Sequence, residues 1–170
     1  KEGAQYLISN KQILRPSIAK GTSTMFLGGL VYLLIIVSED ILKMGSIGLG
    51  LLYAARGLGT GIGPIVGRRL FRDDKDWIKV MGFCYILAGS MYMIVGWTSS
   101  IIIMILFVLL AHTASGANWV MSTILLQQRS TDTFRGRIFS TEWLLYTIGN
   151  SISVIIASIC LEFELIPVRE

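Results

Sequence analysis

Hydrophobic positions fall into five long runs that short polar segments separate. The clearest run, 46–66, is apolar or small except for Arg56. About 21 such residues, at 1.5 Å of helix each, cover the roughly 30 Å hydrocarbon core of a bilayer. The other runs span about 21–37, 77–97, 101–126 and 138–161. We therefore predict an all-α membrane protein with five transmembrane helices.

Small residues recur at every fourth position along the second run: Ala55, Gly59, Gly63 and Gly67. At this spacing they share one helix face, where a second helix can approach backbone to backbone, as in packed membrane helices. We expect Gly57 and Gly61 to widen the same groove. Glycine weakens a helix less in lipid than in water, because the backbone has no competing water there.

Composition favours a membrane protein over a soluble domain. Hydrophobic residues make up 53% of the chain and charged residues only 15%, against about 25% charged in soluble domains. The formal charge of +4 does not predict nucleic-acid binding, because the basic residues form short clusters between apolar runs. Cys84 and Cys160 lack redox or metal spacing, and nothing else predicts a metal or cofactor.

Basic residues predict the orientation, since twelve of the 15 Lys and Arg residues fall on one side. The exceptions are Lys43, Arg169 and the intramembrane Arg56. The positive side is cytoplasmic by the positive-inside rule, so we expect a multi-pass plasma (inner) membrane protein whose residue 1 is cytoplasmic. Because the chain starts at Lys1 without a signal peptide or initiator Met, we expect a fragment of a longer protein.

The segments outside the runs complete the predicted topology. Residues 1–20, including Lys20, form a cytoplasmic segment, either amphipathic at the membrane surface or a plain linker helix, which Pro16 would bend or restart. Residues 127–137 form a polar cytoplasmic loop, and 163–170 form a tail. Trp77 and Trp97 bracket the third run as expected of interface anchors.

Polar residues inside the runs are the candidate functional groups. By helical rise, Arg56 lies about 18 Å from Arg68, near mid-membrane. Asn118 lies at nearly the same depth, and Glu142 is shallower. Polar stripes follow the last two runs: His112, Ser115, Asn118 or Trp119, and Ser122 on one; Glu142, Tyr146, Gly149 or Asn150, Ser153 and Ala157 on the other. These stripes and Arg56 predict a polar cavity between three helices, with the third run at the periphery.

Arg56 and Glu142 have two interpretations, a structural ion pair or a substrate and proton pathway. We favour the pathway, because intramembrane ionisable groups usually mark one. Glu142 then carries a coupling proton, and a neighbouring Arg56 tunes its pKa so that protonation breaks the pair. For Asn118, a substrate contact and an interhelical hydrogen bond are equally good interpretations.

Other polar and aromatic residues have plainer interpretations. His112 has no second ligand at metal spacing and is predicted to be a packed histidine. Trp119, Trp143 and Tyr146 are cavity walls or core packing. The sequence Thr113-Ala114-Ser115-Gly116 is near the GxSG of intramembrane serine proteases, but its first Gly is missing and His112 lies on the same helix. A membrane enzyme is therefore disfavoured.

Three stretches match a known pattern: EGAQYLISNKQILRP, ARGLGTGIGPIVGRR and NWVMSTILLQQRSTDTFRGRIFSTEW. Through them the sequence resembles the C-terminal half of a major facilitator superfamily transporter, of the enterobactin-exporter-like and macrolide-efflux-like branch. The loop motif GxxxDRxGRR of that superfamily is degraded here: Arg68 and Arg69 are present, but Gly67 stands in place of the Asp. The RGR turn of the branch is present as Arg135, Gly136 and Arg137.

The resemblance implies that the five runs are helices seven to eleven of a twelve-helix fold, with all but the ninth lining the cavity. It also implies a secondary transporter, for which we expect proton-coupled efflux of a small amphipathic compound by alternating access. Membrane lipid, a small-molecule substrate and the missing N-terminal half of the same chain are the expected partners. The pathway candidates are Arg56, Asn118, Glu142, Tyr146 and Asn150. A non-transporting membrane scaffold or receptor is the alternative.

Overall fold

The computed structural model describes residues 2–163, apart from the side chains of 2–4, 23 and 26. Its elements are α1 (Glu2–Ser9), α2 (Lys11–Ile36), the π-helical turn η1 (Val37–Ile41), α3 (Gly45–Leu70), the 3-10 turn η2 (Asp74–Asp76), α4 (Trp77–Trp97), α5 (Ile101–Arg129) and α6 (Asp132–Glu162). No strand occurs between residues 2 and 163, so the all-α prediction is confirmed. Five helical segments are long and apolar enough to cross a membrane. Arg169 and the rest of the predicted tail from residue 164 lie outside the described residues.

The first long helix begins earlier than predicted, because α2 already starts at Lys11. The helix break falls at Asn10, whose side chain accepts a hydrogen bond from the Gln12 N–H at 3.2 Å. Pro16 lies inside α2 and has no N–H, so the Gln12 carbonyl loses its usual helical donor. Arg129 Nη1 donates to that carbonyl at 3.2 Å instead. The expectation that Pro16 restarts the helix was wrong.

The predicted polar loop 127–137 was also mostly wrong. Only Ser130 and Thr131 lie between α5 and α6. An ion pair of 2.7 Å between Arg135 Nη2 and Asp132 Oδ1 spans the first turn of α6. Arg135 also donates to the Gln127 carbonyl at 3.3 Å. Polar residues therefore continue both helices beyond their apolar parts, and the RGR sequence is helical.

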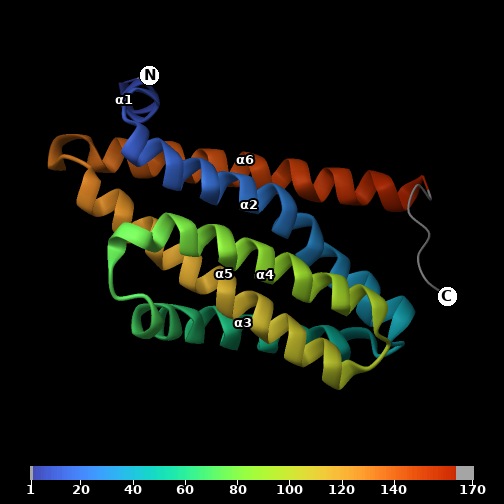
Figure 1. The fold of residues 1–170 in the computed structure, drawn as a ribbon. Helices are drawn as coiled ribbons and strands as arrows, with labels where there is room; N and C mark the ends of the chain where they lie inside the picture. Colours follow the sequence, from blue (N-terminus) through green and yellow to red (C-terminus); the bar gives the residue numbers. More distant parts are fainter. Residues whose placement is uncertain (1, 164–170) are drawn as a thin grey trace.

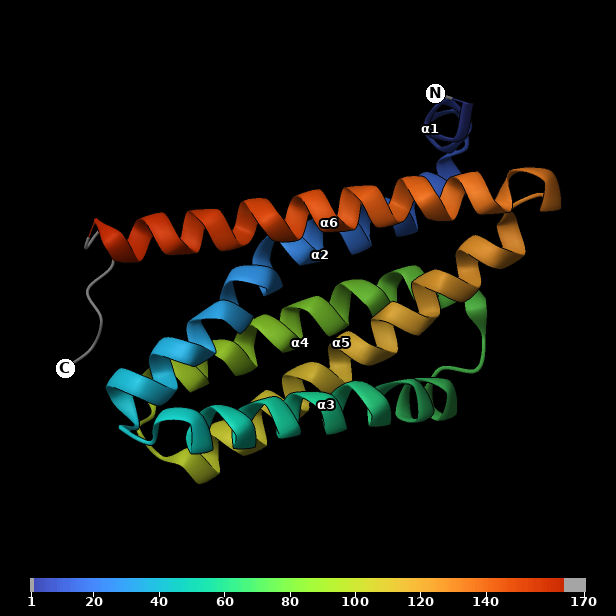
Figure 2. The same ribbon diagram turned by 180° about the vertical axis from the view of Figure 1, so that it is seen from behind.

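The five long helices run side by side in two groups (Figures 1 and 2). In one group α5 packs against α3 on one side and α4 on the other, and in the second group α2 packs against α6. The main apolar core lies within the first group, around Met81, Cys84, Met104 and Val108. Contacts between α2 and α5 join the groups. The polar site described below lies where the groups face each other.

The small residues of α3 face α5. Ala55, Gly59, Gly63 and Gly67 are all buried. A Cβ on Gly63 would overlap the Thr113 carbonyl oxygen and lie 2.7 Å from the Ala117 nitrogen, so the two backbones touch. Gly116 of α5 is equally close to the Thr60 carbonyl oxygen. Gly57 and Gly61 are exposed and a Cβ there would meet nothing within 4 Å, so the expectation that they widen this groove was wrong.

The outer faces of the helices are apolar. Only Ile138, Glu142, Gly149 and Ser153 of α6 are buried, while Ile148, Ile155 and Ile156 are each about half exposed. An exposed apolar surface of this extent marks contact with another apolar phase or partner. Of the two tryptophans predicted to be interface anchors, Trp97 is 86% exposed, whereas Trp77 is buried and its indole N–H bonds the Phe71 carbonyl at 2.9 Å.

Candidate functional site

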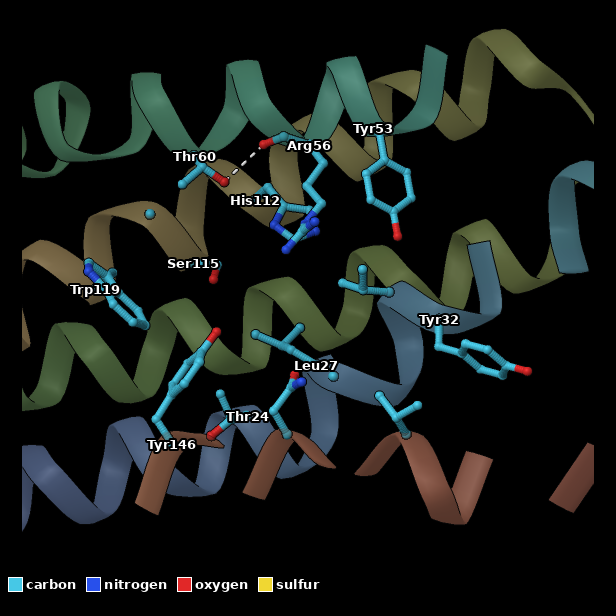
Figure 3. Close-up of a pocket in the computed structure, with 15 residues that line it drawn as sticks. Thr24, Leu27, Tyr32, Tyr53, Arg56, Thr60, His112, Ser115, Trp119 and Tyr146 are labelled. Carbon is cyan, nitrogen blue, oxygen red and sulfur yellow. Dashed lines mark hydrogen bonds between the residues drawn. The ribbon is translucent and has the colours of Figure 1, made fainter. Parts of the chain in front are cut away.

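A cavity of about 380 Å³ lies between α2, α3, α5 and α6 (Figure 3). Polar and aromatic side chains make up most of its wall: Thr24, Tyr32, Tyr53, Arg56, Thr60, His112, Ser115, Trp119, Tyr146 and Asn150. No residue of α4 lines it. The predicted pathway residues Arg56, Tyr146 and Asn150 therefore meet in one cavity. Thr24 and Tyr32 of α2 were not predicted, because they stand singly in an apolar run without forming a stripe.

Arg56 is the only charged residue among the described residues that line this cavity. Figure 3 shows its side chain pointing from α3 into the cavity beside His112. The guanidinium lies 5.4 Å from the centre of the Tyr53 ring, within range of a cation–π interaction. Among residues 2–163 Arg56 forms no ion pair. Its positive charge is therefore directed at the cavity, uncompensated by an acidic side chain.

Glu142 pairs with Lys20, and this replaces the predicted pairing with Arg56. Lys20 Nζ lies 3.2 Å from Glu142 Oε1, and both side chains are 5% exposed. The expectation placed Lys20 in a cytoplasmic linker, whereas it lies within α2. A lysine at the end of an apolar run can make this contact, because its long stem carries the ammonium group to a buried carboxylate. The ion pair links α2 to α6.

An aromatic cluster separates this ion pair from the cavity. Trp143 and Tyr146 stack with ring centroids 5.3 Å apart, and Trp119 meets both rings edge-on, at 5.8 Å and 5.0 Å. The Lys20 ammonium lies 3.8 Å from the centre of the Trp119 ring. Trp119 and Tyr146 line the cavity as well. Trp119 and Tyr146 are therefore both cavity wall and packing, whereas Trp143 packs against them without lining the cavity.

Helix positions place the ion pair at one end of the cavity. Lys20 precedes the lining residue Thr24 by four residues on α2, and Glu142 precedes Tyr146 by four on α6. Residues four apart are stacked on one helix face, one turn from each other. The Lys20–Glu142 pair therefore lies one helical turn beyond the cavity wall, on the side where the cytoplasm is predicted.

His112 is packed as predicted, with a partner that the sequence did not reveal. Its Nε2 lies 2.8 Å from the Tyr92 hydroxyl of α4, and the ring is 5% exposed. No hydrogen bond joins it to Ser115 among the described residues. A tyrosine twenty positions away on the preceding helix carries no signal in the sequence pattern. The same ring lines the cavity beside Arg56.

Asn118 makes no interhelical hydrogen bond among the described residues, and its contact with a substrate stays a prediction. It is 3% exposed, lies outside the cavity wall, and its Oδ1 has no hydrogen-bond partner among residues 2–163. The neighbouring Trp119 occupies the cavity side of α5 instead. The sequence periodicity allowed either Asn118 or Trp119 to complete the polar stripe on α5. Trp119 is the one that faces the cavity.

Close contact between α2 and α6 completes the wall opposite Arg56. The Ser153 Oγ accepts a hydrogen bond from the Gly29 N–H at 2.8 Å. Asn150 Oδ1 lies 2.6 Å from where a Cβ on Gly28 would stand. The Gly28–Gly29 pair thus lets polar α6 side chains reach the α2 backbone, a contact that the small size of glycine permits.

The predicted loop residues lie away from the cavity. Arg68 and Arg69 are exposed in the last turn of α3. Gly136 and Arg137 are exposed on α6, with the Arg137 guanidinium 5.6 Å from the Phe134 ring centre. None of these residues lines the cavity.

Fold and site together define a bundle of long apolar helices with an internal polar cavity. No protein-family model, curated protein or solved structure matches this chain. Within residues 2–163, no cluster of His, Cys, Asp and Glu side chains is arranged to hold a metal ion. The site offers a cation, hydroxyl groups, amides and aromatic faces, which are groups that bind and orient a solute.

Proposed function

We propose that the chain is the C-terminal half of a secondary transporter of the plasma membrane that exports a small amphipathic compound by alternating access in exchange for protons. The observation that carries the proposal is Arg56, directed into a polar cavity between helices whose outer faces are apolar. A cation in this setting marks a pathway for a substrate or ion. The absence of α4 from the cavity wall supports the division of helices implied by the family resemblance.

The cavity wall favours a particular kind of compound. Arg56 is the only charge on the described wall, and Trp119 and Tyr146 add aromatic faces. An uncompensated guanidinium attracts a carboxylate, phenolate or phosphate and binds it with paired N–H donors. We expect the transported compound to carry such an anionic group on an aromatic or apolar body.

Glu142 is the proposed carrier of the coupling proton, with Lys20 in the role first expected of Arg56. Protonation of Glu142 would remove one charge of the pair that joins α2 to α6. A change at this contact can bias two conformations only if it stabilises one more than the other. If protonation favours one conformation over the other, the cavity would open at the end that lies beside the ion pair.

The proposal is tested with the complete protein in proteoliposomes under an imposed pH gradient. The probes are 2-naphthoate and its neutral analogue 2-naphthamide. We expect gradient-driven flux of 2-naphthoate that Arg56→Gln lowers at least tenfold and that Arg56→Lys, which keeps the charge, partly restores. If the unaltered protein adds no flux of either probe to that of protein-free liposomes, transport of this class is refuted and the scaffold or receptor alternative is favoured.

Coupling is tested separately, with Glu142→Gln and the double variant Lys20→Gln/Glu142→Gln. Both variants should retain 2-naphthoate flux down its own gradient and lose the component driven by the pH gradient. The double variant controls for folding, because it leaves no unpaired charge. Unchanged pH-driven flux in a folded double variant would rule out Glu142 as the proton carrier.

A further inference from the structure

A second cavity, of about 500 Å³, lies in the groove between α3 and α5, next to the loop that leads to α4. Arg68, Arg69 and Arg72 line one part of it, and Ile65, Val120 and Ile124 line another. It shares no lining residue with the cavity around Arg56. The groove is therefore a separate site, and the proposed transport does not use it.

The groove carries an uncompensated positive charge. All three arginines are exposed, and none forms an ion pair among residues 2–163. Among the described residues, no acid lines the groove. The adjoining loop carries three acids, Asp73, Asp74 and Asp76, and none of them pairs with an arginine of the groove: Asp76 pairs with Lys79 at 3.0 Å, and Asp73 Oδ1 accepts the Lys75 N–H at 3.1 Å. Three guanidinium groups are thus left for an anion from outside the described chain.

Charge and apolarity are separated along the helix axis. Pro64 and Ile65 lie deeper in α3, and the arginines follow at its end and just beyond. From Pro64 to Arg69 the helix advances five residues, about 7.5 Å at helical rise, and Arg72 lies two residues beyond the end of α3 at Leu70. Ile65 is 58% exposed, so the deeper part of the groove is an open apolar surface. This order, apolar and then cationic, matches the order of acyl chain and phosphate in a phospholipid.

The loop is fixed beside the groove. The Trp77 indole N–H donates to the Phe71 carbonyl at 2.9 Å, and the Phe71 N–H donates to the Gly67 carbonyl at 2.9 Å. Both bonds hold the residue that precedes Arg72. The backbone that carries the third arginine is therefore held next to the end of α3, so the loop itself need not be ordered when an anion binds.

We propose that this groove binds an anionic phospholipid, with its phosphate between Arg68, Arg69 and Arg72 and an acyl chain along Ile65 and Val120. Arginine binds phosphate with paired N–H donors, which favours it over a bulk counterion. Basic pockets between helices at the cytoplasmic membrane surface have this ligand chemistry. The proposal needs the membrane setting of the proposed function but not transport.

The test is native mass spectrometry of the complete protein after titration with phosphatidylglycerol or phosphatidylcholine of the same acyl chains. We expect tighter binding of phosphatidylglycerol, and a loss of affinity of at least tenfold in Arg68→Gln/Arg69→Gln/Arg72→Gln. Phosphatidylcholine binding should not change. A matched control, Lys11→Gln/Arg15→Gln/Arg137→Gln, removes three exposed charges on α2 and α6, away from the groove, and should keep the preference.

Three further measurements separate the alternatives. Replacing the three arginines by lysine keeps the charge and should retain part of the preference, whereas Val120→Trp fills the apolar part and should weaken lipid binding with all charges present. Millimolar glycerol 3-phosphate should not displace phosphatidylglycerol. Displacement would identify a site for free phosphate and overturn the proposal. Equal losses of phosphatidylglycerol affinity in the two glutamine triples would also overturn it. The same holds if the unaltered protein shows no preference for phosphatidylglycerol, which is expected if another part of the chain fills the groove.

Discussion

The interface between α3 and α5 differs from the interface between α2 and α6 in the kind of contact that holds it. Along α3 and α5, small side chains bring backbone onto backbone at Gly63 and Gly116. Along α2 and α6, polar groups make specific pairs, at Lys20–Glu142 and Gly29–Ser153. The first contact is a match of shapes that any added atom disturbs, while the second consists of discrete bonds that can break and form again.

The cavity lies between these two interfaces, and this placement gives the difference a meaning. Close-packed surfaces have few alternative arrangements, so α3 and α5 are expected to stay together. The α2–α6 pair joins the first group mainly through the contacts of α2 with α5. In the proposed transport cycle, movement would therefore occur between the groups, with α3, α4 and α5 as the fixed part.

The sharpest way to break the comparison is to place a side chain in the close-packed interface. Gly63→Val puts atoms where the Thr113 carbonyl oxygen and the Ala117 nitrogen lie. Backbone cannot yield as a flexible side chain does, so we expect a loss well beyond the roughly 1–3 kcal/mol of ordinary overpacking, up to failure to fold. Thermal unfolding in detergent measures it. Gly61→Val, on the open face of the same helix, is the control, and equal losses in the two variants would contradict the packing.

The next largest effect is expected at the buried ion pair. Glu142→Gln leaves the Lys20 ammonium buried without its counter-charge, at a cost of about 3–5 kcal/mol. Lys20→Gln/Glu142→Gln removes both charges and should regain most of that loss, since a buried pair contributes little net stability. Thermal unfolding of the single and double variants forms a double-mutant cycle. Additive losses would show that the two residues do not interact.

A smaller loss is expected where α6 bonds to the α2 backbone. Ser153→Ala removes the hydroxyl that accepts the Gly29 N–H, and we expect a loss of about 1 kcal/mol. Ser151→Ala, at an exposed position two residues away, is the matched control. If both substitutions have the same effect on the unfolding temperature, the hydrogen bond contributes nothing specific.

A loss of the same order is expected at the contact between α4 and α5. Tyr92→Phe removes the hydroxyl that faces His112 Nε2 and should cost about 0.5–1.5 kcal/mol without altering the packing of the ring. Tyr32→Phe changes a tyrosine of the cavity wall in the same way and serves as comparison. A loss confined to Tyr92→Phe supports the structural role of this hydrogen bond, and no loss would argue against it.

The helices and their packing face follow from sequence because they rest on local periodicity. A run of apolar residues fixes the existence of a helix, and a spacing of four fixes the face that Ala55, Gly59, Gly63 and Gly67 share. Helix ends are less local. Pro16 looked like a boundary, yet α2 passes through it because a side chain from α5 supplies the lost donor. The 127–137 segment looked like a loop because its polar residues end the apolar pattern, yet the helices continue beyond their apolar parts.

The site was predictable only in part, because its partners come from separate helices. The stripes on α5 and α6 and the charge of Arg56 point to a shared cavity, and the structure brings Arg56, Tyr146 and Asn150 together. Which acid meets which base depends on helix order in space. Only Arg56 was expected to meet Glu142, because Lys20 stands just before the predicted first run and was assigned to the linker, whereas the structure pairs Glu142 with Lys20.

The exposed apolar flank of α6 has a practical consequence. With four buried residues among 31, this helix is held along a narrow edge, and its apolar flank faces outward. Removal of the surrounding apolar phase would expose that flank to water, so purified chains are expected to aggregate through α6 first. A detergent micelle that covers this helix should therefore decide whether the protein stays monodisperse.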